Sequence, residues 1–184
     1  MRKLIMWNLV TLDGCFEGEK PWDLAWHELV WGEELEQLSI EQLRSADMLV
    51  FGRATYEGMA AYWTTAQGEV ADYMNSLPKV VCSRSLHTAD WNNSILIKDD
   101  TVAAIEKLKQ QGDGNMFLFG SANLSNTLIN ADLFDEYRIG IVPIILGKGR
   151  QLFTPEHKQQ HLKLIENHNT STDCVIVRYR RDRS

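Results

Sequence analysis

Apolar runs alternate with amphipathic stretches along this chain of 184 residues. Residues 3–10, 48–51, 79–82, 94–97 and 116–119 are dominated by apolar side chains. Such runs are typical of strands that are covered on both faces, as in a parallel sheet. The stretches between them have helical character, so the pattern predicts a mostly parallel sheet with helices on both sides.

Five stretches with apolar residues at helical spacing are predicted as helices: residues 27–45, 55–62, 69–76, 101–111 and 121–131. The first of them leads into the strand at 48–51, so a right-handed crossover between two parallel strands is expected. His27 stands at the start of this helix, where a lone histidine is more typical of a surface or capping residue than of a catalyst.

The C-terminal part of the chain has a different pattern. Residues 133–142 are predicted as a strand that passes from a sheet edge inward, and 161–169 with 173–180 as an antiparallel hairpin. Alternation in the hairpin predicts four inward-facing side chains, those of Leu162, Leu164, Val175 and Val177. Together these elements predict a single three-layer α/β/α domain over residues 1–184, with a mostly parallel mixed sheet and this hairpin at its end.

Two predicted strand-to-helix turns share one pattern. The strand before Gly52 leads into a helix that begins with Arg53 and Thr55, and the strand before Gly120 leads into a helix that begins with Ser121. Glycine permits a turn where a Cβ atom would collide, and the N–H groups of a helix start attract anions. Two such turns can hold one extended dianion at the carboxyl ends of the strands. Neither turn has the Rossmann or P-loop glycine pattern, so those two folds are not supported.

Composition narrows the classes of function. A formal net charge of −6 argues against the backbone of a nucleic acid as a partner. Three widely spaced cysteines, Cys15, Cys82 and Cys174, favour a reducing compartment over a disulfide framework. No apolar run is long enough to span a bilayer and no secretory leader is recognised, so a cytoplasmic protein without a membrane partner is expected.

Four segments, in this order and spacing, resemble the dihydrofolate reductase-like superfamily: Gly52–Glu57, Val81–Arg84, Phe119–Ala122 and Pro143–Gly149. Within it the chain is most similar to the branch related to the reductase domain of riboflavin biosynthesis, over nearly its whole length. The resemblance implies a dihydrofolate reductase-like fold and an NADPH-dependent reductase that transfers hydride to a small heterocyclic or sugar-linked substrate. It also implies a homodimer, because relatives commonly form one.

The resemblance assigns nucleotide-binding roles to both turns and to a third segment. Ser83 and Arg84 occupy the position that meets the adenosine end of the cofactor in this superfamily. A hydroxyl and a guanidinium suit a 2′-phosphate, which favours NADPH over NADH. Ser121, Ala122 and Asn123 would face the pyrophosphate. Without the resemblance, Ser121 would be interpreted as an ordinary helix N-cap.

Asp13 is the leading catalytic candidate. Its spacing alone favours a turn-forming role, because it precedes Gly14 directly after the first strand. The resemblance instead implies a place beside the nicotinamide and the substrate. Two roles stay open there, orienting the substrate or relaying a proton to the reduced centre.

Substrate contacts are predicted from Asp13, Trp22, Arg44 and Gly147. Trp22 belongs to an aromatic loop over residues 16–26, which could stack on a flat heterocycle or pack against the domain or a partner subunit. Arg44 retains a Leu-Arg pair of the riboflavin-pathway enzymes, and Gly147 lies in a glycine-containing bend expected to border the substrate pocket.

Two departures from the riboflavin-pathway pattern leave the substrate open. The segment after Gly14 lacks the expected Ser-x-Trp-Ile type sequence, and Gln42 stands where those enzymes have a histidine. The specific reaction of 5-amino-6-(5-phosphoribosylamino)uracil reductase is therefore one possibility among related reductions. The alternative function is a dimeric NADP(H)-binding module without turnover, such as a sensor or stress-related protein.

No metal site is predicted. His157 and His161 have the spacing of two ligands on one helix, but no glutamate lies between them in the zinc-protease pattern and no further ligand completes a set. Two solvated histidines are the favoured interpretation.

Overall fold

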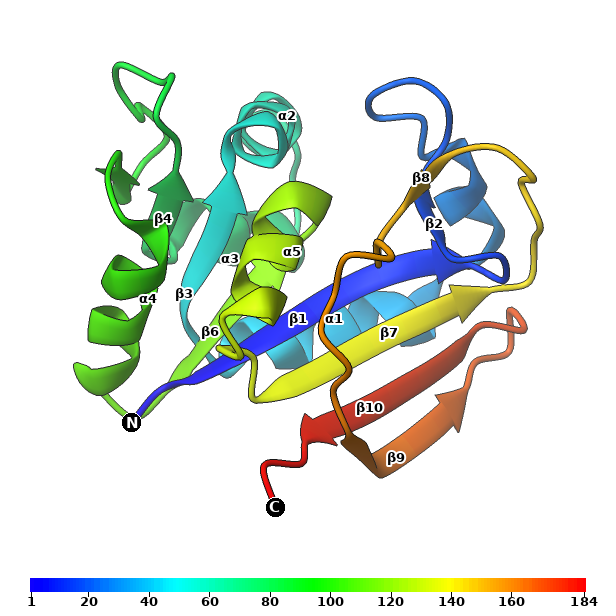
Figure 1. Cartoon of the computed structure of the whole chain (residues 1–184). Coiled ribbons are helices and arrows are strands. Elements are labelled where there is room, and N and C mark those ends of the chain that lie inside the picture. The colour runs from blue at the N-terminus through cyan, green and yellow to red at the C-terminus, as the bar shows by residue number, and fades with distance from the viewer.

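The computed structural model describes residues 1–184 and contains one mixed eight-stranded sheet, in the order β5-β4-β3-β6-β1-β7-β10-β9 (Figure 1). Its strands are β1 (Lys3–Thr11), β3 (Ala46–Gly52), β4 (Lys79–Cys82), β5 (Ser94–Ile97), β6 (Asn115–Phe119), β7 (Glu136–Val142), β9 (Leu162–Asn169) and β10 (Val175–Arg181). The helices are η1 (Ala25–Leu29, a 3₁₀ turn), α1 (Glu33–Arg44), α2 (Arg53–Trp63), α3 (Glu69–Ser76), α4 (Thr101–Gln110) and α5 (Ala122–Asn130). Two short strands, β2 (Cys15–Glu17) and β8 (Arg150–Gln151), form a separate antiparallel pair.

Strand β1 lies inside the sheet, between β6 and β7, and is parallel to both. Strands β3, β4 and β5 continue the parallel arrangement on one side. On the other side β10 runs antiparallel to β7 and pairs with β9. The predicted α/β architecture, with a mostly parallel mixed sheet and a C-terminal antiparallel hairpin, is therefore confirmed.

Two hydrophobic layers cover the sheet. Leu35 and Leu43 of α1 and Met74 of α3 pack on one face, whereas Ile105 of α4 and Leu128 of α5 pack on the other. Figure 1 shows α4 and α5 in front of the sheet and α1 behind it. The central strands are buried by both layers, which is why their sequences are continuous apolar runs rather than alternating ones. None of the helices is long and apolar enough to cross a membrane.

Most element boundaries agree with the prediction to within two residues, and two differ by more. The helix predicted over 27–45 begins only at Glu33, because Gly32 has extended backbone geometry and the residues before it form the short turn η1. The strand predicted from residue 133 begins at Glu136, because Asp132 has a left-handed φ of 53° and the Leu133 N–H still bonds the carbonyl oxygen of Leu128.

The predicted inward face of the C-terminal hairpin is wrong for three of its four residues. Leu162, Leu164 and Val175 are 40%, 52% and 37% exposed, whereas Ile176 is buried. All of β9 is exposed, because it is the last strand of the sheet and no helix covers it. The alternation was visible in the sequence, but the side that would be covered depends on neighbours distant in the chain.

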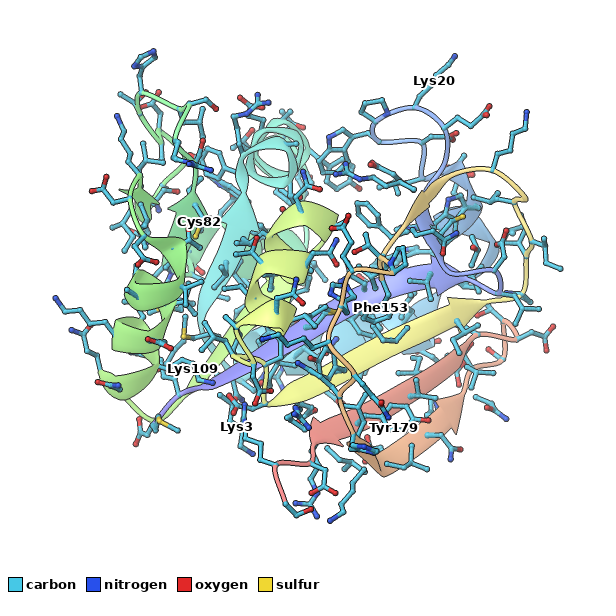
Figure 2. The ribbon with its side chains drawn as sticks, viewed as in Figure 1. Lys3, Lys20, Cys82, Lys109, Phe153 and Tyr179 are labelled. Atoms are coloured by element: carbon cyan, nitrogen blue, oxygen red, sulfur yellow. The ribbon has the colours of Figure 1, made fainter.

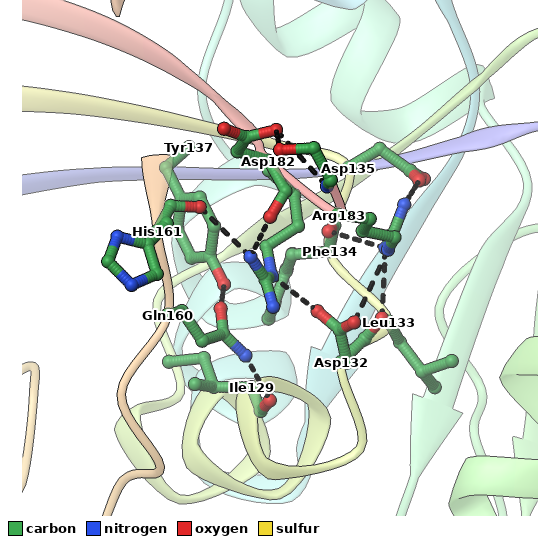
Figure 3. A network of polar contacts seen from close by, with 12 residues as sticks. Ile129, Asp132, Leu133, Phe134, Asp135, Tyr137, Gln160, His161, Asp182 and Arg183 are labelled. Carbon is green, nitrogen blue, oxygen red and sulfur yellow. Dashed lines mark hydrogen bonds and ion pairs between the residues drawn. The ribbon is translucent and has the colours of Figure 1, made fainter. Parts of the chain in front are cut away.

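A network of hydrogen bonds and ion pairs holds the C-terminal residues near the amino end of β1 (Figure 3). Arg183 donates to Asp135 Oδ1 at 3.1 Å and to Asp132 Oδ2 at 3.3 Å. Asp135 Oδ2 in turn accepts a bond of 2.6 Å from the buried Lys109 and one of 2.9 Å from the Leu4 N–H. This network stabilises the end of the sheet opposite to the two glycine turns.

Candidate functional site

The two glycine turns meet where the adjacent parallel strands β3 and β6 end. A Cβ atom added to Gly52 would lie 2.2 Å from Ser121 Oγ, and one added to Gly120 would lie 3.1 Å from Thr55 Cγ2. The turns therefore converge, as the sequence pattern led us to expect. Glycine suits position 52 because the hydroxyl of Ser121 occupies the space that a side chain at position 52 would need.

A cavity of about 1090 Å³ opens at these turns. Its lining contains every residue predicted to bind the cofactor, namely Gly52, Arg53, Thr55, Ser83, Arg84, Gly120, Ser121, Ala122 and Asn123. They come from the carboxyl ends of β3, β4 and β6 and from the first turns of α2 and α5. The topology brings three separate segments of the chain to one edge of the sheet.

The turn between β6 and α5 has an unusual backbone. Gly120 and Ser121 have φ values of 64° and 60°, both in the left-handed region. Ser121 occupies the N-cap position of α5, but its side chain makes no capping hydrogen bond, so the ordinary N-cap interpretation does not hold. No side chain therefore covers the first N–H groups of α5, which leaves them able to donate to an anion.

Asn8 holds this turn in place from the neighbouring strand. Its Oδ1 accepts a hydrogen bond of 2.9 Å from the Gly120 N–H, while its buried Nδ2 has no partner. Asn8 also lines the cavity. Sequence reasoning assigned it no role, although a polar residue within the apolar run of β1 was the signal that could have identified it.

Four cationic side chains line the polar part of the cavity, together with the carboxylates of Glu17, Asp99 and Asp100. Arg84 and Lys98 line it without forming an ion pair, whereas Arg53 is paired with Glu57 at 3.1 Å. Arg150 bridges two elements, with one bond of 3.1 Å to Glu17 and another of 2.7 Å to Asn123 Oδ1. Arg84 is thus free to meet an anionic ligand without breaking an existing pair.

An aromatic loop crosses from β2 toward α2 beside the cavity. Trp22 has a left-handed φ of 63°, and its indole lies so close to Gly58 that a Cβ atom there would be 2.0 Å from the ring. The backbone N–H of Trp22 donates to Glu17 Oε2 at 3.2 Å. Trp22 lines the cavity, and its contact with a substrate stays a prediction. Lys20 projects from the tip of the loop (Figure 2).

The remainder of the cavity is an apolar chamber between β1 and helices α1, α2 and α3. Trp7, Trp31 and Trp63 line it, together with His27. The Nε2 atom of His27 is shielded from solvent and has no hydrogen-bond partner, and burial lowers the pKa of its imidazole to about 4. His27 is therefore neither a capping residue nor fully solvated, although its side chain is only half-buried. The nearby Trp26 and Trp31 were the available sign of an apolar environment.

Asp13, Gly147 and Arg44 do not line the cavity. Asp13 accepts bonds from Thr11 Oγ1 at 2.6 Å and from the Gly147 N–H at 2.8 Å, and these bonds lower the pKa of its carboxyl. It therefore ties the bend after β7 to the end of β1. Arg44 donates to Glu69 at 3.2 Å on the surface of α1 and α3. Direct contacts of these residues with a substrate stay predictions.

A comparison with known protein families shows to which family the chain belongs. Residues 2–177 match the family model of the RibD C-terminal domain. The chain belongs to this family. The uncharacterized protein YyaP of Bacillus subtilis is 29% identical over 186 residues, which cover 97% of this chain and 94% of that protein.

Two solved structures show the fold of this RibD C-terminal domain. A putative riboflavin biosynthesis protein from Shewanella sp. PV-4 superposes with a TM-score of 0.82 at 22% identity, over 98% of this chain and 99% of that one. Dihydrofolate reductase from Enterococcus faecalis, complexed with NADP(H) and RAB-propyl, superposes with a TM-score of 0.64 at 14% identity, over 98% of this chain and 96% of that one. The chain thus has the dihydrofolate reductase-like fold that the resemblance implied.

In this RibD C-terminal domain the cavity has two chemically distinct parts. One part offers glycine turns, helix N–H groups and the cation of Arg84, which suit phosphoryl groups. The other offers tryptophan rings and a neutral imidazole, which suit an aromatic ring. The arrangement can hold a phosphorylated ligand and a flat ligand next to each other.

Proposed function

We propose that this protein is an NADPH-dependent reductase that transfers hydride to a small heterocyclic or sugar-linked substrate. One observation carries the proposal. The Gly52 and Gly120 turns converge, together with Arg84, in one cavity, and this cavity continues into an aromatic chamber. A volume of about 1090 Å³ exceeds that of a usual single-ligand pocket, which favours two ligands bound together.

The residues present fit a dinucleotide with a 2′-phosphate. We assign the pyrophosphate to the first turns of α2 and α5, where Gly52 and Gly120 keep the backbone accessible. Ser83 and Arg84 would hold the 2′-phosphate, since no carboxylate takes their place after β4. NADPH, when bound, supplies the hydride. The family, and the NADP(H) complex of the Enterococcus faecalis enzyme, support this choice of cofactor.

The protein's own contribution is to position the ligands and exclude water. Trp22 and its loop would cover the reacting groups, since the indole already rests on Gly58 beside the cavity. Asp13 would act on the reaction through the Gly147 bend that it holds. The activity is related to that of 5-amino-6-(5-phosphoribosylamino)uracil reductase.

We further propose a homodimer formed through β9. This strand is the edge of the sheet, and it exposes Leu162, Leu164 and Ile165 in one run. An exposed apolar edge strand favours pairing with another chain. Light scattering after size-exclusion chromatography measures the mass, and a monomer at micromolar concentration would refute this part of the proposal.

A second candidate function is an NADP(H)-binding module without turnover. The position of Asp13 outside the cavity lining favours it, because the leading catalytic candidate does not face the chamber. Both functions require the nucleotide site, and they differ only in whether a bound acceptor is reduced.

The deciding experiment is a thermal shift followed by an oxidation assay. At about a hundred times its Kd, NADPH should raise the Tm by about 5–10 °C, and NADH should raise it less. The loss of NADPH absorbance is then followed with pyrimidine, pteridine and quinone acceptors. Oxidation with one acceptor supports the reductase, and binding without oxidation over the panel supports the module. No shift with either nucleotide would overturn both.

A further inference from the structure

Arg150 connects the glycine turn before α5 with the aromatic loop. Its Nη1 donates to Glu17 Oε1 at 3.1 Å, and its Nη2 donates to Asn123 Oδ1 at 2.7 Å. Asn123 belongs to the first turn of α5, whereas Glu17 is the last residue of β2, where the aromatic loop begins. One guanidinium therefore bridges two segments that are far apart in the sequence.

Glu17 uses its second carboxylate oxygen to hold the loop. Its Oε2 accepts the bond of 3.2 Å from the backbone N–H of Trp22, and its side chain is only 13% exposed. Pairing of β2 with β8 places Arg150 opposite Glu17, and a Cβ atom added to Gly149 would lie 2.6 Å from the Glu17 carbonyl oxygen. The backbones of this ion pair are thus packed closely together. A continuous path of polar contacts runs from Asn123 through Arg150 and Glu17 to Trp22.

The loop conformation at the end of this path is strained. Trp22 has a φ of 63°, in a region that bulky side chains rarely adopt. The loop is also closed on itself by a bond of 3.0 Å from the Gly18 N–H to the Asp23 carbonyl oxygen, so it can move as a unit. A strained conformation persists only where its surroundings hold it. Loss of the Glu17 contact would therefore release the loop.

A phosphoryl group at the start of α5 would change the other end of the path. Asn123 Oδ1 is a neutral acceptor, whereas a phosphoryl oxygen is anionic and makes a hydrogen bond about twice as strong. A guanidinium has five donors in a fixed fork, so Arg150 can exchange Asn123 for a phosphoryl oxygen and still keep Glu17. The anion would hold Arg150, and through it Glu17, more firmly than Asn123 does.

We propose that Arg150 is a positioning residue that couples occupancy of the nucleotide site to the conformation of residues 18–23. This inference rests on the proposed function. The nucleotide holds Arg150, Arg150 holds Glu17, and Glu17 holds the Trp22 N–H. Coupling between two sites is reciprocal, so a ligand that favours this loop conformation binds more tightly once the nucleotide is bound.

Hydrogen exchange followed by mass spectrometry tests the coupling in the full chain. Saturating NADPH should slow the amide exchange of residues 18–23 about tenfold, within the usual range of coupling between two sites. Arg150→Lys keeps the charge but lacks the planar fork, so it should lose this slowing at saturating NADPH. A titration of each variant establishes saturation. Lys148→Ala is the matched control, because it removes an exposed cation of the same bend from outside the cavity, and it should behave as the wild type.

The dependence on nucleotide separates coupling from a structural role. If Arg150 were only structural, Arg150→Lys would change the exchange rate by the same factor with and without NADPH, and this result would overturn the proposal. Equal slowing by NADPH in Arg150→Lys and the wild type would also overturn it.

Inorganic pyrophosphate is the second probe, because it supplies the phosphoryl contact alone. It should slow exchange of the loop in the wild type and not in Arg150→Lys. A thermal shift with NADPH without slowing of the loop by either probe would refute the coupling and leave the proposed function standing. Slowing by pyrophosphate without a thermal shift from NADPH would refute the proposed function and leave the coupling standing.

Discussion

The side-chain Oδ1 of Asn8 accepts a hydrogen bond of 2.9 Å from the backbone N–H of Gly120, a residue 112 positions later in the chain. This bond joins β1 to the turn that precedes α5. Asn8 is only 5% exposed, so water cannot replace it as the acceptor. The position of the first N–H groups of α5 therefore depends on a side chain of β1.

Replacement of Asn8 by alanine should destabilise the turn and weaken cofactor binding. The Gly120 N–H would lose its acceptor, at a cost of about 1–3 kcal/mol in the free energy of unfolding. Urea denaturation measures this loss, and a thermal shift with NADPH measures the weaker binding. Asn167→Ala is the control, because Asn167 is exposed on β9, and it should change stability by less than about 0.5 kcal/mol. Equal stabilities of the two variants would contradict the role of Asn8.

Gly52→Ala should force the two turns apart. The new Cβ atom would lie 2.2 Å from Ser121 Oγ, and overpacking of this kind costs about 1–3 kcal/mol. Adding Ser121→Gly removes the clashing side chain and suits the left-handed φ of that residue, so the double variant should recover most of the loss. Denaturation curves of the wild type, the two single variants and the double variant give the free energies of unfolding for a double-mutant cycle. Additive effects would show that the turns do not touch.

Arg84→Ala should lower the affinity for NADPH more than that for NADH. Arg84 lines the cavity without an ion-pair partner, so its guanidinium is available to the extra phosphate of NADPH. We expect about a tenfold rise in the Kd for NADPH, the size of one charge-assisted hydrogen bond, and little change for NADH. Calorimetric titration gives both values. Arg180→Ala removes an exposed arginine outside the cavity and serves as the control. Equal losses for both nucleotides would place the 2′-phosphate elsewhere.

Lys79→Met should destabilise the fold strongly. The fully buried Nζ of Lys79 donates to the carbonyl oxygens of Asn75, Leu77 and Asn92 at 3.1, 2.8 and 3.0 Å. Methionine fills a similar volume but leaves the oxygens of Leu77 and Asn92 without a donor, while the Asn75 oxygen keeps one from Asn92 Nδ2 at 3.3 Å, so we expect a loss of about 3 kcal/mol. Urea denaturation against Lys107→Met tests this, because Lys107 is exposed on α4. A loss no larger than that of the control would show that water replaces the ammonium.

The stability of the protein should depend on His27 between pH 6.5 and 4. Burial lowers the pKa of His27 from 6.5 to about 4, so in this window the unfolded chain binds a proton that the folded chain does not. The stabilisation is complete above pH 6.5 and is lost as the pH falls toward 4, by up to about 3 kcal/mol. His27→Phe should lack this component, and the difference between the two denaturation series isolates it from the carboxyl groups. Parallel pH profiles would contradict the buried position of the ring.

Local patterns predicted most of the elements, and particular residues show why. The boundaries of α3 and the start of β4 coincide with those predicted, because Gly68 and Pro78 mark them in the sequence itself. The start of α1 was predicted too early, because nothing in the apolar spacing distinguishes a 3₁₀ turn from the first turn of a helix.

The candidate site was predicted where it depends on backbone geometry. Gly52 and Gly120 follow continuous apolar strands, and parallel neighbours end at the same edge, so convergence of their turns follows from local sequence. The place of Asp13 at the reaction centre came from the resemblance and stays a prediction. Its bond to the Gly147 N–H, 134 residues away, could be seen only in the structure.

The amino-acid sequence by itself determined the order of strands and helices along the chain, the two glycine turns and the family of the protein. Each of these depends on short segments of consecutive residues. Only the tertiary structure decided that the Nε2 atom of His27 is shielded from solvent, that Asn8 bonds Gly120, and that Leu164 faces outward. Those three properties depend on which distant segments cover a side chain. Burial and hydrogen-bond partners are set by packing, and periodicity within one element does not contain that information.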